Sequence, residues 1–404
     1  MRTKETWSPK QMSSEPIAKS HFSGALTTAG YVEDAPPATA ESADVSRSGS
    51  GTTLARTATE RVDDAEVDGG TAQVEGVEDR VSGRELQREL SDERLDDLAI
   101  ISTIEKPPTA TQGWRGLMAR LGIAMQPGTR ERDELDAATE LAQHETVIRQ
   151  FVGTEAVGIL VANPKGSSGK TPTSIVLGGL LATIRGGSVA VLEVSDDRGT
   201  LAFRAEGNPT RGVSELVRDA TTIRSAGQLA GYTAPQTSYA SIIGSVGNRE
   251  PLSRDDVLAA ARVIDEYYAI RVMDSGNQPT SSAFAGAIDT SNALVVPVLN
   301  SADVVLEAIA MFDRLRDHSP HGARLADTAI IVRLVDGRPE NPQLVARLDE
   351  IIDRAGVGGA FTIPYDPHIA ERGQITLHKI APATRAAFTR AAAAVVQTIQ
   401  NNTK

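Results

Sequence analysis

The chain contains no cysteine among its 404 residues. This absence excludes disulfide-stabilised scaffolds, cysteine nucleophiles and thiolate metal sites, and it is typical of proteins in a reducing compartment. The six histidines are scattered along the sequence without the spacing of metal ligands, so the sequence predicts no zinc motif.

Long apolar runs are also missing. No stretch approaches the roughly 18 consecutive apolar residues that a membrane-spanning helix needs. The first residues, MRTKETWSPKQMSSEP, are polar and lack the apolar segment of a signal peptide. We therefore expect a cytoplasmic protein, whose contact with the inner face of a membrane, if it has one, is peripheral.

Basic residues are fewer than acidic ones, 41 against 53, and the resulting net charge of -12 is unevenly distributed. Residues 1–110 contain 12 basic and 21 acidic residues, so most of the acidity lies in this segment. The segment has few large apolar side chains, and their burial cannot offset an ordering cost of about 1–2 kcal/mol per residue. The composition therefore predicts a disordered acidic tail over residues 1–110.

One part of the tail, residues 84–101, has leucines at the spacing of a short helix. These leucines are Leu86, Leu90, Leu95 and Leu98. Two interpretations stay open, a partner-binding segment that folds on contact and a transient helix without a role.

Residues 113–152 are predicted to form a helical lead-in to the following domain. In GWRGLMARLGIAM, one helical stripe carries the apolar residues Trp114, Leu117, Met118 and Leu121. Such a stripe favours packing on the following domain over contact with a membrane surface or a partner. A second helix is predicted over residues 130–151.

Strand and helix patterns alternate over residues 153–402. Continuous Val-, Ile- and Leu-rich runs are typical of buried parallel strands, and they occur at 156–163, 188–194, 238–246, 269–274, 293–299, 328–335 and 359–363. Helical patterns separate most of them, at 169–185, 211–220, 253–267, 301–317, 342–355 and 383–400. This order predicts one α/β domain with a mostly parallel sheet and helices on both faces.

The clearest functional motif lies between the first strand and the first helix of this domain. It reads Asn163-Pro164-Lys165-Gly166-Ser167-Ser168-Gly169-Lys170-Thr171. In that context small residues let backbone N–H groups surround phosphate oxygens, and the helix start adds its positive dipole end. Lys170 is expected to reach the β and γ phosphates, and the Thr171 hydroxyl is expected to bind Mg²⁺.

The loop resembles the deviant Walker A loop, KGGxGK[ST], of the ParA/MinD family of P-loop ATPases. The resemblance implies that residues 165–171 bind ATP and that Lys165 reaches the nucleotide of a second subunit in an ATP-dependent homodimer. Lys165 and Lys170 are the only lysines between residues 107 and 378, where arginine serves as the basic residue everywhere else. Ser167 stands where the family usually has glycine, so a positive φ there would strain the backbone.

The resemblance extends over roughly residues 155–400 and implies roles for two further segments. LEVSDDRGTL (192–201) is similar to the switch I segment of actinobacterial MinD-like proteins linked to type VII secretion and conjugation. Ser195 aligns with the usual water-activating Asp, so Asp196 and Asp197 become the catalytic candidates, with a solvated turn as the alternative. The Walker B-like strand IRVMDSGN implies that Asp274 holds Mg²⁺ and that Gly276 and Asn277 form switch II.

For the base, the family often uses an Asn on a late strand, where this chain has Arg333 instead. The segment IPYDP is similar to the loop after the last strand of MinD relatives, which implies that Pro364 and Asp366 bind the nucleotide; an ordinary turn is the alternative. The final helix, TRAAFTRAAAAVVQTIQ, lacks the lysine-rich character of the MinD membrane-targeting tail. Its alanine-rich composition favours a core helix.

These features favour an Mg²⁺-dependent ATPase that acts as a dimerisation switch and positions a secretion or conjugation component, with the acidic tail as a tether. The first alternative is a DNA-partition ATPase, which a net charge of about -3 over residues 111–404 does not favour. The second is a nucleotide-binding scaffold with little turnover, which Ser167 and Ser195 keep open.

Overall fold

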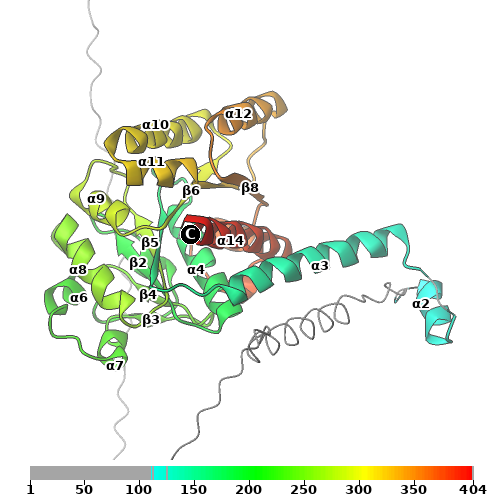
Figure 1. The fold of residues 1–404 in the computed structure, drawn as a ribbon, viewed down its shortest axis with the longest axis horizontal. Coiled ribbons are helices and arrows are strands. Elements are labelled where there is room, and N and C mark those ends of the chain that lie inside the picture. The colour runs from blue at the N-terminus through cyan, green and yellow to red at the C-terminus, as the bar shows by residue number, and fades with distance from the viewer. Residues whose placement is uncertain (1–110, 112, 124–125, 403–404) are drawn as a thin grey trace, which may run out of the picture. The chain divides into compact units, whose positions relative to one another are not determined.

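A computed structural model of the chain describes residues 111, 113–123 and 126–402 (Figure 1). The predictions of a disordered tail over residues 1–110 and of a helix over 84–101 lie outside the described residues.

An eight-stranded sheet forms the centre of the domain, with the strand order β3-β4-β2-β5-β1-β6-β7-β8. Every neighbouring pair is parallel except β3 and β4, which confirms the predicted mostly parallel sheet. The strands are β1 (Val157–Val161), β2 (Val189–Val194), β3 (Ala234–Pro235), β4 (Ser241–Ile243), β5 (Ile270–Ser275), β6 (Ala293–Leu299), β7 (Ile330–Leu334) and β8 (Gly359–Ile363).

Helices cover both faces of the sheet (Figure 1). One apolar core lies between the sheet and α6 (Val213–Asp219), α8 (Arg254–Asp265), α9 (Ser282–Asp289), α10 (Ala302–His318), α11 (Pro320–Asp327) and α12 (Pro342–Arg354). The other lies between the sheet and α3 (Thr129–Gln150), α4 (Lys170–Arg185), α5 (Leu201–Arg204) and α14 (Pro382–Asn402). The remaining elements are α2 (Gly113–Arg120), α7 (Ala226–Ala230), α13 (Pro367–Ala370) and the 3₁₀ helix η1 (Leu377–Lys379).

The strand order brings three functional segments to one edge of the sheet. Strand β1 lies between β5 and β6, and β5 in turn lies beside β2. The carboxyl ends of parallel strands share an edge, so the loops after β1, β2 and β5 converge there. In register, Val161 of β1 and Glu193 of β2 both pair with Asp274 of β5.

Of the sequence predictions for the helices α14 and α2, one is confirmed and one is wrong. Ala387, Phe388 and Val396 are among the buried residues of α14, which confirms the predicted core helix. At α2, however, the expected packing of the apolar stripe on the following domain is wrong, because Trp114 and Leu117 of the helix and Leu121 just after it are 65%, 60% and 70% exposed.

Local structure departs from the sequence predictions mainly in short elements. The strand expected over residues 238–246 is limited to β4, because the chain enters it through the antiparallel edge pair with β3. The sequence reading did not identify α5, α7, α9, α11, α13 and η1, which have eight residues or fewer. No helix among the described residues is long and apolar enough to cross a bilayer.

Gly158 in β1 provides a test of how closely the sheet is packed. A Cβ atom at this position would lie 2.1 Å from the backbone oxygen of Thr290, which cannot move as a side chain could. We expect Gly158→Ala to destabilise the protein by about 2 kcal/mol or more in urea unfolding. Gly373→Ala is the matched control, since no atom lies within 4 Å of its Cβ, and equal stabilities of the two variants would contradict the prediction.

Candidate functional site

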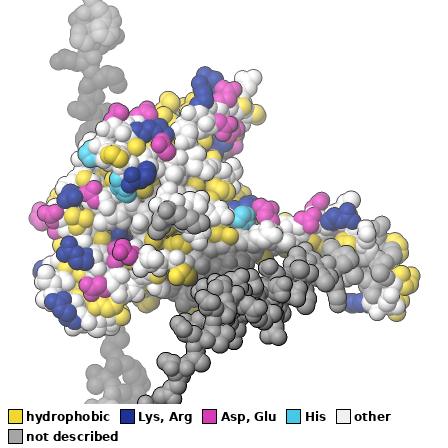
Figure 2. Space-filling model, in the orientation of Figure 1, with side chains coloured by type: hydrophobic (Ala, Val, Ile, Leu, Met, Phe, Trp, Pro, Cys, Tyr) yellow, Lys and Arg dark blue, Asp and Glu magenta, His cyan; other side chains and the backbone are white. Residues whose placement is uncertain are grey.

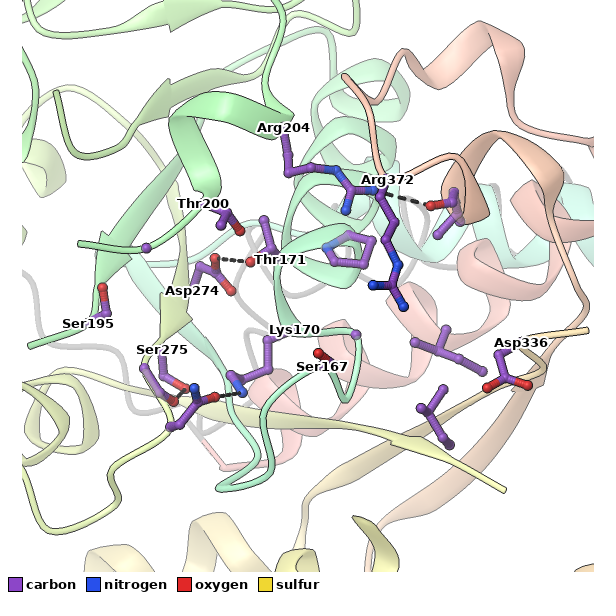
Figure 3. Close-up of a pocket in the computed structure, with 18 of the residues that line it drawn as sticks. Ser167, Lys170, Thr171, Ser195, Thr200, Arg204, Asp274, Ser275, Asp336 and Arg372 are labelled. Carbon is purple, nitrogen blue, oxygen red and sulfur yellow. Dashed lines mark hydrogen bonds between the residues drawn. The ribbon is translucent and has the colours of Figure 1, made fainter. Parts of the chain in front are cut away.

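A pocket of about 860 Å³ opens at the carboxyl ends of the central strands (Figure 3). Its walls come from the loop after β1, the segment after β2, the end of β5, and the loops after β7 and β8. The structure therefore brings together the candidate residues that the sequence placed on separate segments. Those lining the pocket are Ser167, Gly169, Lys170, Thr171, Asp196, Asp197, Asp274, Gly276, Asn277, Pro364 and Asp366.

The loop between β1 and α4 turns through two left-handed residues. Gly169 caps α4 at φ 98°, a left-handed conformation that favours glycine, and a Cβ there would also displace Leu334 Cδ1, 2.0 Å away. Ser167 has φ 63°, the positive value that the sequence identified as a source of strain. A non-glycine residue in this conformation costs about 1–2 kcal/mol. The Ser168 hydroxyl is buried without a hydrogen-bond partner.

Lys170 is the most constrained cation of the loop. Its Nζ donates to the Asn163 carbonyl at 2.9 Å, the Lys165 carbonyl at 3.1 Å and Asn277 Oδ1 at 2.6 Å. Burial lowers the pKa of Lys170 to about 8, and the charge of Asp274 opposes this change. The ammonium is thus tied to the loop after β5 and lies where a phosphate chain in the loop would meet it.

Asp274 joins α4 to β5. Its carboxylate accepts hydrogen bonds from the Thr171 hydroxyl at 2.8 Å and the Ser174 hydroxyl at 3.2 Å. Burial is the main cause that raises the pKa of Asp274 to about 7; Glu193 raises it further, while the Thr171 hydrogen bond opposes the rise.

Glu193 is a buried carboxylate of the site that the sequence analysis missed. It is 1% exposed and interrupts the otherwise apolar strand β2, which is the signal that could have identified it. One oxygen accepts from the Gly199 N–H at 3.0 Å and also from the Ser245 hydroxyl. The other oxygen, Oε2, is buried without a partner.

Arg249 neutralises Glu193 and holds the segment after β2. Its Nη2 lies 3.3 Å from Glu193 Oε1, and both side chains are 1% exposed. The same guanidinium donates to the backbone oxygens of Ser195 at 2.7 Å and Asp197 at 2.8 Å, and also to that of Asp196. One buried cation therefore fixes the conformation of residues 195–197.

Asp196 and Asp197 follow this anchored stretch. A Cβ placed on Gly276 would lie 2.8 Å from Asp196 Oδ1, so the segment after β2 approaches the one after β5 closely here. Asp197 is exposed, and its carbonyl accepts a hydrogen bond from the Ser195 hydroxyl at 2.5 Å. Both carboxylates line the pocket, and their catalytic role stays a prediction.

Lys165 does not contact the pocket. Its Nζ lies 3.0 Å from Asp303 Oδ2 at the start of α10, with side-chain exposures of 45% and 57%. Gly166, the next residue, lies close to the Asn277 side chain. A Cβ atom built on Gly166 would be 3.6 Å from Asn277 Nδ2. Lys165 is thus held by an exposed ion pair within its own chain.

The far end of the pocket contains the segment after β8. Asp366 is buried, and its carboxylate accepts from the backbone N–H groups of His368 and Ala381 at 3.0 and 2.9 Å. The bond from His368 caps α13, and the bond from Ala381 ties the same carboxylate to the residue before α14, so Asp366 has a structural role in addition to its place in the pocket wall. Arg333 instead donates to Asn300 and pairs with Asp349.

The oxygen donors fit a hard divalent cation. Thr171 and Asp274 supply a hydroxyl and a carboxylate in contact with each other at the phosphate loop. Within the described part of the chain, no cluster of three or more His, Cys, Asp or Glu side chains could hold a metal. Mg²⁺ takes few protein ligands and completes its shell with water and phosphate, so Thr171 and Asp274 are residues that could hold it.

The raised pKa of Asp274 predicts a pH effect on stability without nucleotide or metal. Between about pH 4 and 7 the folded protein binds more protons than the unfolded chain, so stability falls as pH rises. Relative to Asp274→Asn, the wild type should lose up to about 1.4 kcal/mol of unfolding free energy per pH unit there. Urea titrations at pH 5 and 7 measure this, and parallel pH profiles would contradict it.

The Arg249–Glu193 pair predicts a second stability effect. Arg249→Met leaves a buried carboxylate without a counter-charge and should cost about 3–5 kcal/mol in urea unfolding. Adding Glu193→Gln should recover part of that loss because it removes the stranded charge. Arg347→Met, which breaks an exposed pair, is the control with little effect. A double variant no more stable than Arg249→Met would refute this account.

Two solved structures are similar to this chain at low sequence identity and low TM-score. A ParA family ATPase from Chlorobium tepidum TLS has a TM-score of 0.46 and 10% identity, over 62% of this chain and 98% of that one. The cell division ATPase MinD of Pyrococcus furiosus has a TM-score of 0.44 and 17% identity, over 61% and 99%.

Among curated proteins, the ESX-1 secretion-associated protein EspI of Mycobacterium tuberculosis is 23% identical over 284 residues. The match covers 67% of this chain but only 40% of EspI. Residues 159–376 match the family described as the CobQ/CobB/MinD/ParA nucleotide binding domain. That range begins in β1 and ends beyond α13, so it contains every wall of the pocket. The chain belongs to the CobQ/CobB/MinD/ParA family of nucleotide-binding domains.

Proposed function

We propose that the chain binds ATP with Mg²⁺ and hydrolyses it as a dimerisation switch. The observation that carries the proposal is the joint placement of Lys170, Thr171 and Asp274 at one phosphate loop. The N–H groups at the start of α4 and the Lys170 ammonium suit the phosphate chain of a nucleotide. The pocket continues from there to the segment after β8, which leaves room for a base and sugar.

Thr171 and Asp274 are the residues that would hold Mg²⁺, Asp274 through a water molecule. When bound, Mg²⁺ supplies charge neutralisation on the phosphate oxygens. Hydrolysis also needs an oriented water, for which Asp196 and Asp197 are the proposed residues. Arg249 fixes the backbone that carries them, and this anchoring supports a defined position for the attacking water.

Gly276 and Asn277 are the proposed sensor of the phosphate chain, because Asn277 contacts Lys170 directly. A ligand that draws Lys170 toward itself weakens that contact and releases the segment after β5. This coupling is of the kind that transmits nucleotide state in switch proteins.

Lys165 is the proposed cross-subunit contact of an ATP-dependent homodimer. Its ion pair with Asp303 is exposed on both sides, and exposed pairs contribute little stability. The ammonium can therefore leave Asp303 at small cost and reach a nucleotide held by a second copy. In the single chain, the ion pair with Asp303 holds the Lys165 ammonium outside the pocket of the same chain.

For the partner, we propose a component of a secretion or conjugation machine. The support is the similarity to EspI, whose name associates it with ESX-1 secretion, although this chain matches less than half of it. A DNA-partition role is less favoured. On the face drawn in Figure 2, basic and acidic side chains are intermixed rather than gathered into a basic patch.

A nucleotide-binding scaffold with little turnover is the second candidate. The strained backbone at Ser167 favours it, as does the serine at position 195, whose hydroxyl is engaged with the backbone of Asp197. Turnover measurements separate the two candidates.

Phosphate release and size-exclusion chromatography with Mg-ATP or Mg-ADP test the proposal. We expect wild type to release phosphate and to dimerise with ATP only. Lys170→Ala should reduce phosphate release by about a hundredfold or more, because it removes a preorganised cation from the phosphate chain. Lys165→Ala should keep ATP binding and lose the ATP-dependent dimer.

Lys379→Ala is the matched control, since this exposed lysine of η1 lies outside the pocket wall and should behave as wild type. If Lys165→Ala dimerises like wild type, the cross-subunit role is wrong. ATP binding without phosphate release above the Lys170→Ala background would favour the scaffold.

A further inference from the structure

Two arginines without an acidic partner line the pocket wall that lies opposite the phosphate loop. Arg204 ends α5, and Arg372 follows α13. Both line the pocket. In Figure 3 the Arg204 guanidinium lies beside the start of the Arg372 side chain, and the Arg372 guanidinium extends from there toward the Ser167–Lys170 loop. In the part of the chain that the structure describes, neither forms an ion pair with a carboxylate.

Arg204 is more than nine-tenths buried, with 9% of its surface exposed. Among the described residues, its guanidinium has one hydrogen bond, a 3.3 Å contact from Nη2 to the Ile369 carbonyl, and its Nε is buried without a partner. Burial lowers the pKa of Arg204, and the charge of Arg372 lowers it further. A buried guanidinium cannot lose its proton, so the site as it stands holds repelling charges and unmade hydrogen bonds.

Arg372 reaches the pocket through a backbone that is itself strained. Its φ of 57° is left-handed, at a cost of about 1–2 kcal/mol for a non-glycine residue. Other pocket arginines are differently placed: Arg338, for example, is neutralised by Asp336. The Arg204–Arg372 pair is therefore a concentrated positive charge directed at the pocket.

The phosphate loop lacks a donor on its side of the same pocket. Gly169 caps α4, and Pro172 is the third residue of that helix. The first N–H groups of a helix have no acceptor within it and are available to an anion, but proline has none. The helix ladder begins at the Thr173 N–H, which donates to the Gly169 carbonyl at 3.0 Å. Beyond Thr171, toward the sugar, the helix thus offers no backbone donor.

We propose that Arg204 and Arg372 form an anion subsite for the phosphate nearest the sugar, the α-phosphate of the bound nucleotide. The subsite compensates for the N–H that Pro172 lacks. It rests on the proposed nucleotide binding and adds a contact that no residue of the loop supplies. A guanidinium fork is suited to a phosphate, because two parallel N–H groups meet two oxygens. Arg372 is the exposed and movable partner, and Arg204 the fixed one.

Calorimetric titration of the full chain with ATP and ADP tests the subsite. Both nucleotides carry the α-phosphate, so Arg372→Gln should weaken both by the same factor, about tenfold or more. Arg204→Gln should weaken the binding of both nucleotides in the same way if the variant folds. If it does not fold, Arg372→Gln still tests the subsite, because Arg372 is exposed. Arg262→Gln, an exposed arginine of α8 outside the pocket wall, is the control and should bind as wild type.

A double-mutant cycle with Pro172→Ala identifies the contacted group, since alanine restores the missing N–H. The loss caused by Arg372→Gln should be smaller in the Pro172→Ala background than in wild type. A loss confined to ATP, a loss that is additive with Pro172→Ala, or unchanged affinity in Arg372→Gln would each overturn the subsite. Wild type that binds neither nucleotide would overturn the proposed function instead, and the subsite with it.

Discussion

The buried carboxylate of Asp274 is the interaction on which the site depends. It lies near the end of the central strand β5 and accepts hydrogen bonds from two residues in the first two turns of α4. These bonds hold the phosphate loop against the sheet, and the resulting burial is what displaces the pKa values of both Asp274 and Lys170. Low solvent access makes each charge costly alone, and the attraction between the carboxylate and the ammonium offsets part of the effect of burial on both pKa values.

The neighbouring strand, β2, also carries a buried carboxylate. Glu193 pairs with Asp274 in register, which places a second carboxylate beside the first in the interior. Arg249 balances it and, through its remaining N–H groups, fixes the backbone after β2. Charge compensation of one buried acid thereby orders a segment of the pocket wall. The segments after β2 and β5 are thus both tied to buried charged groups.

The two sides of the pocket share a further property. Ser167 on the phosphate loop and Arg372 on the opposite wall both have left-handed backbones, which non-glycine residues adopt only when the surroundings impose them. Strained residues of this kind concentrate at functional sites. Two of the four left-handed non-glycine residues of the described chain, Ser167 and Arg372, line the pocket, and the other two, Ser188 and Tyr239, lie outside its wall.

The fold was largely predictable, because buried parallel strands are continuous apolar runs and the helices between them repeat at 3.6 residues. Seven of the eight strands were predicted, and β3 was not, because two residues of an antiparallel edge pair leave no periodic pattern. Short helices were missed for a similar reason. Eight residues give about two turns, and only caps such as Ser319 before Pro320 mark them.

For the site, the sequence alone determined the phosphate loop, Lys170, Thr171 and Asp274, since each stands at a recognisable place relative to a strand or helix. Only the tertiary structure decided which distant side chains lie together at the site. Arg249 lies 56 residues from Glu193, and Arg372 is far along the chain from Arg204. Nothing local in the sequence specifies such pairs, because strand order and loop paths bring them together. Burial, which gives those charges their strength, exists only once the chain has folded.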